Sequence, residues 1–200
     1  DKEVVVINKD KVTIYNNYGA EVKKEIFHVE WDVAAAEKSG YEHFMMKEIC
    51  EEPKVVRDTV SPRIKDGRIV LDDIKITDED LKNIGKIYIV ACGTAYHAGV
   101  VGKYIIEKLA RIPVEVEVAS EFRYRDPLIS NRDLAIIISQ SGETIDTLFA
   151  LREAKKKGAR ILSIVNVVGS SIARESDSVL YTWAGPEIAV ASTKAYNSQL

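Results

Sequence analysis

Three hydroxyl groups, an amide and a glycine follow directly after the apolar run LAIII at 134–138. They belong to the stretch SQSGET at 139–144, which contains no Lys or Arg. A second stretch of this kind, ACGTAY at 91–96, follows the apolar run KIYIV. Hydroxyl groups and free backbone N–H groups at the start of a helix can bind an anion through dipoles instead of full charges. The two stretches therefore predict a site for a phosphate ester.

Other phosphate-binding motifs are absent from the sequence. There is no G-x-x-x-x-G-K-[ST] pattern, and the run GTAYHAG lacks the spacing G-x-G-x-x-G, which excludes a nucleotide P-loop and a dinucleotide fingerprint. Gly142 has no Cβ and would let the backbone approach a ligand closely. From composition alone, SQSGET could equally be a helix cap in a polar loop. Two such stretches after successive buried strands favour the anion site.

Strands and helices alternate in the segment that carries both stretches. The patterns predict strands at 86–91, 114–118, 134–139, 160–166 and 178–183, and helices that follow the two donor stretches. This alternation predicts an α/β fold, a doubly wound, mostly parallel sheet flanked by helices. Ligands of such folds bind beyond the carboxyl ends of the strands, where both donor stretches lie.

The first 85 residues have a different pattern. β-Branched runs at 4–7 and 12–15 predict a β-rich piece that is too short to be a domain alone. A helix is expected after it, ending before Pro53, which would open a second helix. The interpretation divides the chain into three segments, 1–38, 39–85 and 86–200.

Composition and charge limit the classes of function. The chain has 200 residues, a net charge of −3 and 46% hydrophobic residues, so it can supply a core and has no dominant basic surface for nucleic acid. No apolar run approaches the roughly 20 residues that span a membrane. Cys50 and Cys92 make no metal-ligand spacing. We expect a reduced, cytoplasmic protein without metal or organic cofactor, and a fragment of something longer.

Several reactive side chains have a structural explanation. Cys92 is expected to be a small thiol at a strand end, because no His or Asn stands near it in sequence. His97 is interpreted as a surface histidine and Lys194 as a structural or solvated lysine. Glu143 lies at a helix start, where a carboxylate is electrostatically favoured. The run EFRYR at 121–125 is compatible with a subunit or domain contact.

SQSGETIDTL and ACGTAYHAG resemble the SIS (sugar isomerase) domain family, a phosphosugar-binding module. Longer stretches are similar to the branch of this family in which a glutaminase domain precedes two SIS domains. They are VVVINKDKVTIYNNYG, HVEWD, EKSGYEHFMMKEICEEP, ASEFRYRDP and GPEIAVASTKAYNSQL. The resemblance implies that 1–38 is the C-terminal piece of a glutaminase-like domain. It also implies that 39–85 opens the isomerase half and that 86–200 is a truncated first SIS domain.

The resemblance implies an aminotransferase that makes glucosamine-6-phosphate from fructose-6-phosphate and glutamine-derived ammonia, in hexosamine biosynthesis. The family's catalytic residues would lie outside this chain, so we expect none within it, and expect binding without the complete reaction. A non-catalytic phosphosugar-sensing module and a plain phosphosugar isomerase are the alternatives. The family also implies a homo-oligomer.

The resemblance also implies which residues bind the ligand. The phosphate would contact Ser139, Gln140, Ser141 and Thr144, and the sugar Cys92, Gly93, Thr94, Val190 and Ser192. Ala95 stands where the family usually has a serine that reaches the phosphate, so one donor is missing.

Overall fold

A computed structural model describes residues 2–25, 37–71 and 74–200. Residues 26–36, inside the predicted first segment, therefore lie outside the described residues, and so does the whole of the stretch HVEWD at 28–32. The chain divides into two compact units, Asp1–Glu30 and Trp31–Leu200.

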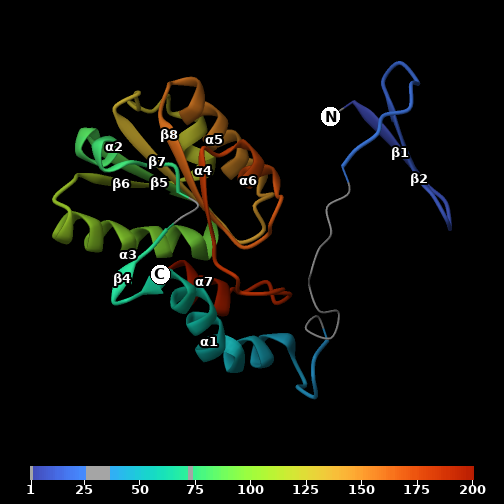
Figure 1. Ribbon diagram of the computed structural model, residues 1–200, viewed down its shortest axis with the longest axis horizontal. Helices are drawn as coiled ribbons and strands as arrows, with labels where there is room; N and C mark the ends of the chain where they lie inside the picture. Colours follow the sequence, from blue (N-terminus) through green and yellow to red (C-terminus); the bar gives the residue numbers. More distant parts are fainter. Residues whose placement is uncertain (1, 26–36, 72–73) are drawn as a thin grey trace. The chain divides into compact units, whose positions relative to one another are not determined.

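The first unit contains an antiparallel hairpin of β1 (Glu3–Ile7) and β2 (Val12–Asn16), in which Val5 pairs with Ile14 (Figure 1). Among the described residues of this unit, only Thr13 is buried. An isolated two-stranded hairpin is marginally stable at best. The β-rich start that the sequence predicts is confirmed.

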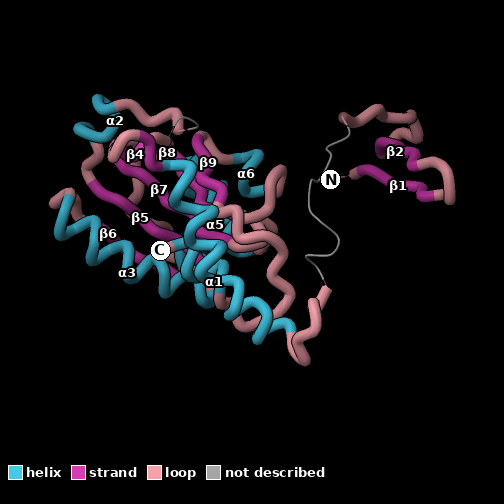
Figure 2. Tube along the Cα trace, turned by 60° about the horizontal axis from the view of Figure 1, so that its bottom comes forward, coloured by secondary structure: helices cyan, strands magenta, loops and turns pink. Residues whose placement is uncertain are grey.

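The second unit is built on a five-stranded sheet. Its strands are β5 (Lys86–Ala91), β6 (Val114–Val118), β7 (Asp133–Ser139), β8 (Arg160–Val165) and β9 (Ser178–Tyr181). They lie in the order β6-β5-β7-β8-β9, and every neighbouring pair is parallel. Figure 2 shows the strands side by side with helices around them. The predicted doubly wound parallel sheet is confirmed.

Helices cover both faces of this sheet. They are α3 (Gly93–Leu109), α4 (Ala119–Tyr124), α5 (Ile145–Lys156) and α6 (Ser171–Glu175). On β7, Ile137 belongs to the core that α4, α5 and α6 cover, whereas Ile136 and Ile138 belong to the core under α3. A strand buried on both faces explains the continuous apolar run at 134–138.

The order of the strands creates a switch point between β5 and β7. The chain leaves β5 through α3 to reach β6 at one edge, and then returns to β7 on the other side of β5. In doubly wound sheets, ligands bind in the crevice outside the carboxyl ends of the strands at such a point. Both donor stretches begin there.

The remaining elements of the second unit precede and follow the sheet. They are α1 (Phe44–Val60), a 3-10 helix η2 (Ser61–Arg63), a small hairpin of β3 (Ile64–Lys65) and β4 (Arg68–Ile69), α2 (Asp78–Asn83) and α7 (Lys194–Gln199).

Pro53 lies inside α1, so the prediction that it opens a second helix was wrong. The same distant segment of chain holds the helix on both sides of the proline. Before it, Glu48 Oε1 accepts the N–H of Ile188 at 2.6 Å. After it, Thr59 Oγ1 donates to the carbonyl oxygen of Thr182. These tertiary contacts offset the hydrogen bond that a proline removes from a helix.

The Arg152–Glu175 pair, which joins α5 to α6, predicts a pH dependence of stability. Arg152 Nε and Nη2 lie 2.8 and 2.6 Å from the two carboxylate oxygens, and these hydrogen bonds lower the pKa of Glu175 below its usual 4.5. Because the folded pKa is lowered, the stabilisation is present above the unfolded pKa and is lost as pH falls through the folded value.

We expect Glu175→Gln to lower the free energy of unfolding by about 0.5 kcal/mol at pH 7, since solvent screens this partly exposed pair, and by progressively less as the pH falls below 4.5. Urea unfolding at pH 7 and at a series of lower pH values measures the difference. An equal loss at every pH would contradict this account of the pair.

Candidate functional site

A cavity of about 150 Å³ opens beyond the carboxyl ends of β5 and β7. Seven of the nine residues that the sequence analysis assigns to ligand binding line it: Cys92, Thr94, Ser139, Gln140, Ser141, Thr144 and Ser192. Two stretches about 45 residues apart, and a third segment before α7, therefore come together at the predicted place.

Gly93 and Val190 are not among the lining residues. Gly93 is the first residue of α3 and has a φ of +58°, which glycine adopts without strain. Val190 is fully exposed in the loop before α7. Contact of these two residues with a ligand stays a prediction.

The hydroxyl groups of SQSGET have protons left to donate. Ser139 Oγ accepts the Gly142 N–H at 3.1 Å, and Ser141 Oγ accepts the Glu143 N–H at 3.2 Å. The hydroxyl oxygens of Ser139 and Thr144 lie 3.3 Å apart. Since each hydroxyl has one proton and two lone pairs, at most one of the three protons is used by that contact. This part of the lining offers donors.

Two helix starts add further donors. α3 begins at Gly93 and α5 at Ile145, and their N-cap residues Cys92 and Thr144 make no side-chain capping hydrogen bond. The first backbone N–H groups of a helix lack partners within it and carry a partial positive charge. Within the described part of the chain, no charged side chain lines this cavity. Dipoles and hydroxyl groups therefore set its electrostatics.

The shape of the SQSGET loop is fixed by contacts with α6. Glu143 Oε1 accepts the Ser171 N–H at 2.7 Å, so this carboxylate caps α6. The Gly142 carbonyl accepts the Ile172 N–H at 3.0 Å. Gly142 has a φ of +65°, and a Cβ on it would lie 2.1 Å from Ser170 Oγ. Only glycine fits this close approach of the loop to α6.

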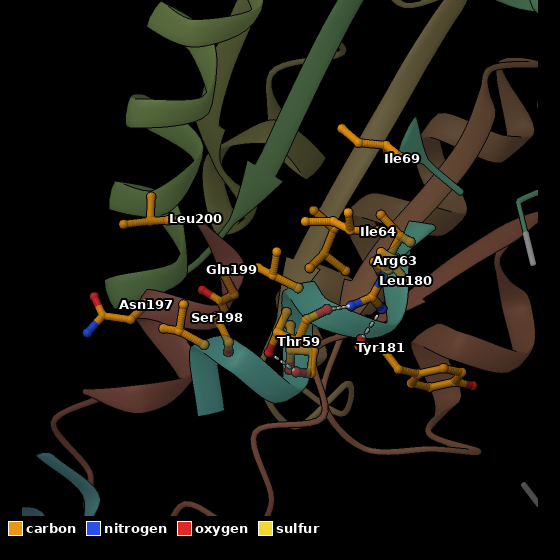
Figure 3. Close-up of a pocket in the computed structure, with 14 residues that line it drawn as sticks. Thr59, Arg63, Ile64, Ile69, Leu180, Tyr181, Asn197, Ser198, Gln199 and Leu200 are labelled. Atoms are coloured by element: carbon orange, nitrogen blue, oxygen red, sulfur yellow. Dashed lines mark hydrogen bonds between the residues drawn. The ribbon is translucent and has the colours of Figure 1, made fainter. Parts of the chain in front are cut away.

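A larger cavity of about 360 Å³, shown in Figure 3, lies between α1, β9 and α7. A large apolar pocket is often a ligand site. Here the only charged lining residue among those described, Arg63, donates from Nη2 to the Tyr181 carbonyl at 2.5 Å, and Thr59 Oγ1 donates to the Thr182 carbonyl. The smaller cavity is therefore the better candidate for an anion.

A model of the SIS domain family matches residues 80–200 of this chain. The chain belongs to the SIS domain family. It is 67% identical over its full length to the glutamine–fructose-6-phosphate aminotransferase [isomerizing] of Clostridium acetobutylicum and 65% identical to that of Clostridium tetani. In each case it spans 33% of the relative, so it covers about a third of the length of these curated proteins.

Solved structures agree with this assignment to the SIS domain family. The C-terminal domain of glucosamine-fructose-6-phosphate aminotransferase from Francisella tularensis superposes with a TM-score of 0.75 and 49% sequence identity. The match covers 82% of this chain and 46% of that one. The architecture described above is therefore shared with that domain.

Sequence reasoning missed two polar residues, Thr147 and Gln199, that line this cavity. Thr147 is buried, and its Oγ1 donates to Cys92 Sγ at 3.7 Å. It lies three residues after Thr144, on the same side of a helix start, and this spacing could have identified it. Gln199 lines the cavity from α7, and no pattern in the sequence pointed to it. Ala95 also lines the cavity, where the family usually offers a serine.

The other reactive residues that the sequence analysis singled out lie outside the lining of this cavity. Lys194 is 3% exposed, and its Nζ lies 2.6 Å from Glu51 Oε2, so it is a buried structural lysine. His97 is exposed. Arg125, in the run EFRYR, pairs with Glu115 at 2.8 Å within the chain. Among the described residues, no three His, Cys, Asp or Glu side chains gather to hold a metal, and no helix is long and apolar enough to cross a membrane.

Proposed function

We propose that this SIS domain binds the phosphate group of a phosphosugar, fructose-6-phosphate or glucosamine-6-phosphate, in the cavity beyond β5 and β7. The observation that carries the proposal is the set of free donors. Hydroxyl groups with available protons and two uncapped helix starts surround a cavity that no charged side chain lines. Such donors suit phosphate oxygens, which only accept hydrogen bonds when ionised.

The cavity is large enough for a phosphate group but leaves the sugar attached to that phosphate outside. Its volume of about 150 Å³ is below the roughly 300–1,000 Å³ of pockets that enclose a drug-sized ligand. A phosphate at the SQSGET loop would therefore leave the sugar to extend past Cys92, Thr94 and Ser192. In this arrangement Gly93 and Val190 are further contacts for the sugar.

Within a longer protein, the chain would supply the phosphosugar-binding part of a glutamine–fructose-6-phosphate aminotransferase. The identity of 67% to such an enzyme, and the matched third of its length, support this proposal. Imine formation and proton transfer between C1 and C2 need a positioned amine and a base. No such group lines this cavity among the described residues. The isolated chain would bind the phosphosugar without completing the reaction. The longer protein would be a cytoplasmic homo-oligomer, and residues 1–38 would form the end of its glutaminase-like domain.

Calorimetric titration of the chain with fructose-6-phosphate and glucosamine-6-phosphate tests the proposed site. We expect Ser141→Ala and Thr144→Val each to weaken binding by about 1–3 kcal/mol, because a phosphate oxygen loses its donor. Ser120→Ala, a matched change in α4 outside the cavity lining, should bind like the wild type. Unchanged affinity in both site variants would place the phosphate elsewhere.

A further inference from the structure

Ser192 lines the same cavity, but its proton is used differently from those of the SQSGET hydroxyls. Its Oγ donates to Glu187 Oε2 at 2.9 Å. A serine hydroxyl has one proton, so after this bond only its lone pairs remain for another group. Ser192 therefore offers the cavity an acceptor, whereas Ser141 and at least one of the pair Ser139 and Thr144 offer donors.

The carboxylate of Glu187 is itself held in place at the start of α7. Its Oε1 accepts the Thr193 N–H at 2.9 Å and the Ala195 N–H at 3.2 Å. Two backbone donors on one oxygen orient the other oxygen toward Ser192. Since an ionised carboxylate only accepts hydrogen bonds, Ser192 must be the donor in this pair.

We propose that Glu187 is a positioning residue that fixes Ser192 as a hydrogen-bond acceptor. The cavity would thereby select a phosphate ester that carries a hydroxyl group over inorganic phosphate or a deoxygenated ester. This inference rests on the proposed phosphate site, because it takes the SQSGET loop as the anion end. A site built to bond a hydroxyl discriminates strongly against an analogue that lacks it, since its polar groups are then left unpaired.

The first test compares fructose-6-phosphate, its singly deoxygenated analogues and inorganic phosphate by calorimetry on the 200-residue chain. We expect one analogue to bind about 5- to 10-fold more weakly than fructose-6-phosphate, the loss of one hydrogen bond. Ser192→Ala should weaken the binding of fructose-6-phosphate by a similar factor. In this variant, fructose-6-phosphate and that analogue should bind with equal affinity. Its affinity for inorganic phosphate should stay within about 2-fold of the wild type.

Glu187→Gln tests the positioning role separately from folding. The amide oxygen can replace Oε1 as acceptor of both backbone N–H groups, which leaves the NH₂ group facing Ser192. Ser192 then accepts from the amide and turns its proton outward. A ligand hydroxyl can accept that proton, so the melting temperature and the preference for the hydroxyl over the deoxygenated analogue should be kept. The wild type should also prefer the hydroxyl over a fluorinated analogue, whose fluorine accepts but cannot donate, and in Glu187→Gln we expect this second preference to fall to within about 2-fold.

Each outcome decides a different point. If Ser192→Ala weakened the binding of inorganic phosphate and of fructose-6-phosphate equally, Ser192 would be a hydrogen-bond donor to the phosphate, and the inference would be overturned. If Glu187→Gln kept the wild-type preference for the hydroxyl over the fluorinated analogue, the role of Glu187 would be overturned. If wild-type chain binds fructose-6-phosphate without discriminating any analogue, the inference fails and the phosphate site stands. If it binds no phosphosugar, the proposed function fails, and the inference with it.

Discussion

The Gly142→Ala chain is expected to unfold with a free energy about 3 kcal/mol lower than that of the wild type, and to lose phosphosugar binding. Two costs add. The new Cβ would lie 2.1 Å from Ser170 Oγ and 2.5 Å from Ser170 Cβ, and the φ of +65° is strained for any residue but glycine. The hydroxyl of Ser170 can rotate away, but its Cβ cannot move without the backbone of α6. The SQSGET loop would therefore separate from α6.

Two variants isolate the clash from the backbone strain. Gly169 has a similar φ of +72°, and a Cβ on it would have nothing within 4 Å. Gly169→Ala should therefore lower the free energy of unfolding by only about 1 kcal/mol. Adding Ser170→Gly to Gly142→Ala removes the clashing atoms and should restore most of the difference. Urea unfolding measures all three variants. If Gly142→Ala and Gly169→Ala cost the same, the close approach to α6 does not constrain the loop.

Glu48→Ala is expected to lower the free energy of unfolding by about 2 kcal/mol and to loosen the segment that carries Ser192. Glu48 is 2% exposed, and its Oε1 accepts the N–H groups of Ile188 at 2.6 Å and Ala189 at 3.2 Å. Truncation leaves both donors unpaired and a void at α1. Hydrogen exchange of the two amides, together with urea unfolding, measures the effect.

Glu48→Gln is the matched control for this prediction. Its amide oxygen can keep both bonds, and its NH₂ group replaces Oε2, which is buried and has no hydrogen-bond partner among the described residues. We expect this variant to stay within about 1 kcal/mol of the wild type. A loss as large as that of Glu48→Ala would show that the charge of Glu48, and not its acceptor oxygen, stabilises the segment.

The strands, and the gathering of the donor stretches at one edge of the sheet, could be predicted because local patterns encode them. Apolar runs such as 134–138 mark buried strands, and parallel strands bring their carboxyl ends to one edge of a sheet. The donor stretches after β5 and β7 therefore had to meet at the switch point. Pro53 was misread, because a local rule about proline does not include the tertiary bonds of Glu48 and Thr59.

The polarity of the cavity lining could not be predicted. The direction of the Ser192 hydrogen bond depends on Glu187, and the fit of Gly142 depends on Ser170. Gln199 reaches the cavity only because α7 folds back to it from the end of the chain. Hydrophobic periodicity identifies the buried face of an element, but it carries no information about these partners.

A crystal structure of the chain with fructose-6-phosphate tests the proposed site most directly. Our account predicts phosphorus density beside the hydroxyl groups of Ser139, Ser141 and Thr144, at the starts of α3 and α5, with the sugar extending toward Ser192. Density for the ligand in the larger cavity beside Arg63, with the SQSGET loop empty, would contradict it.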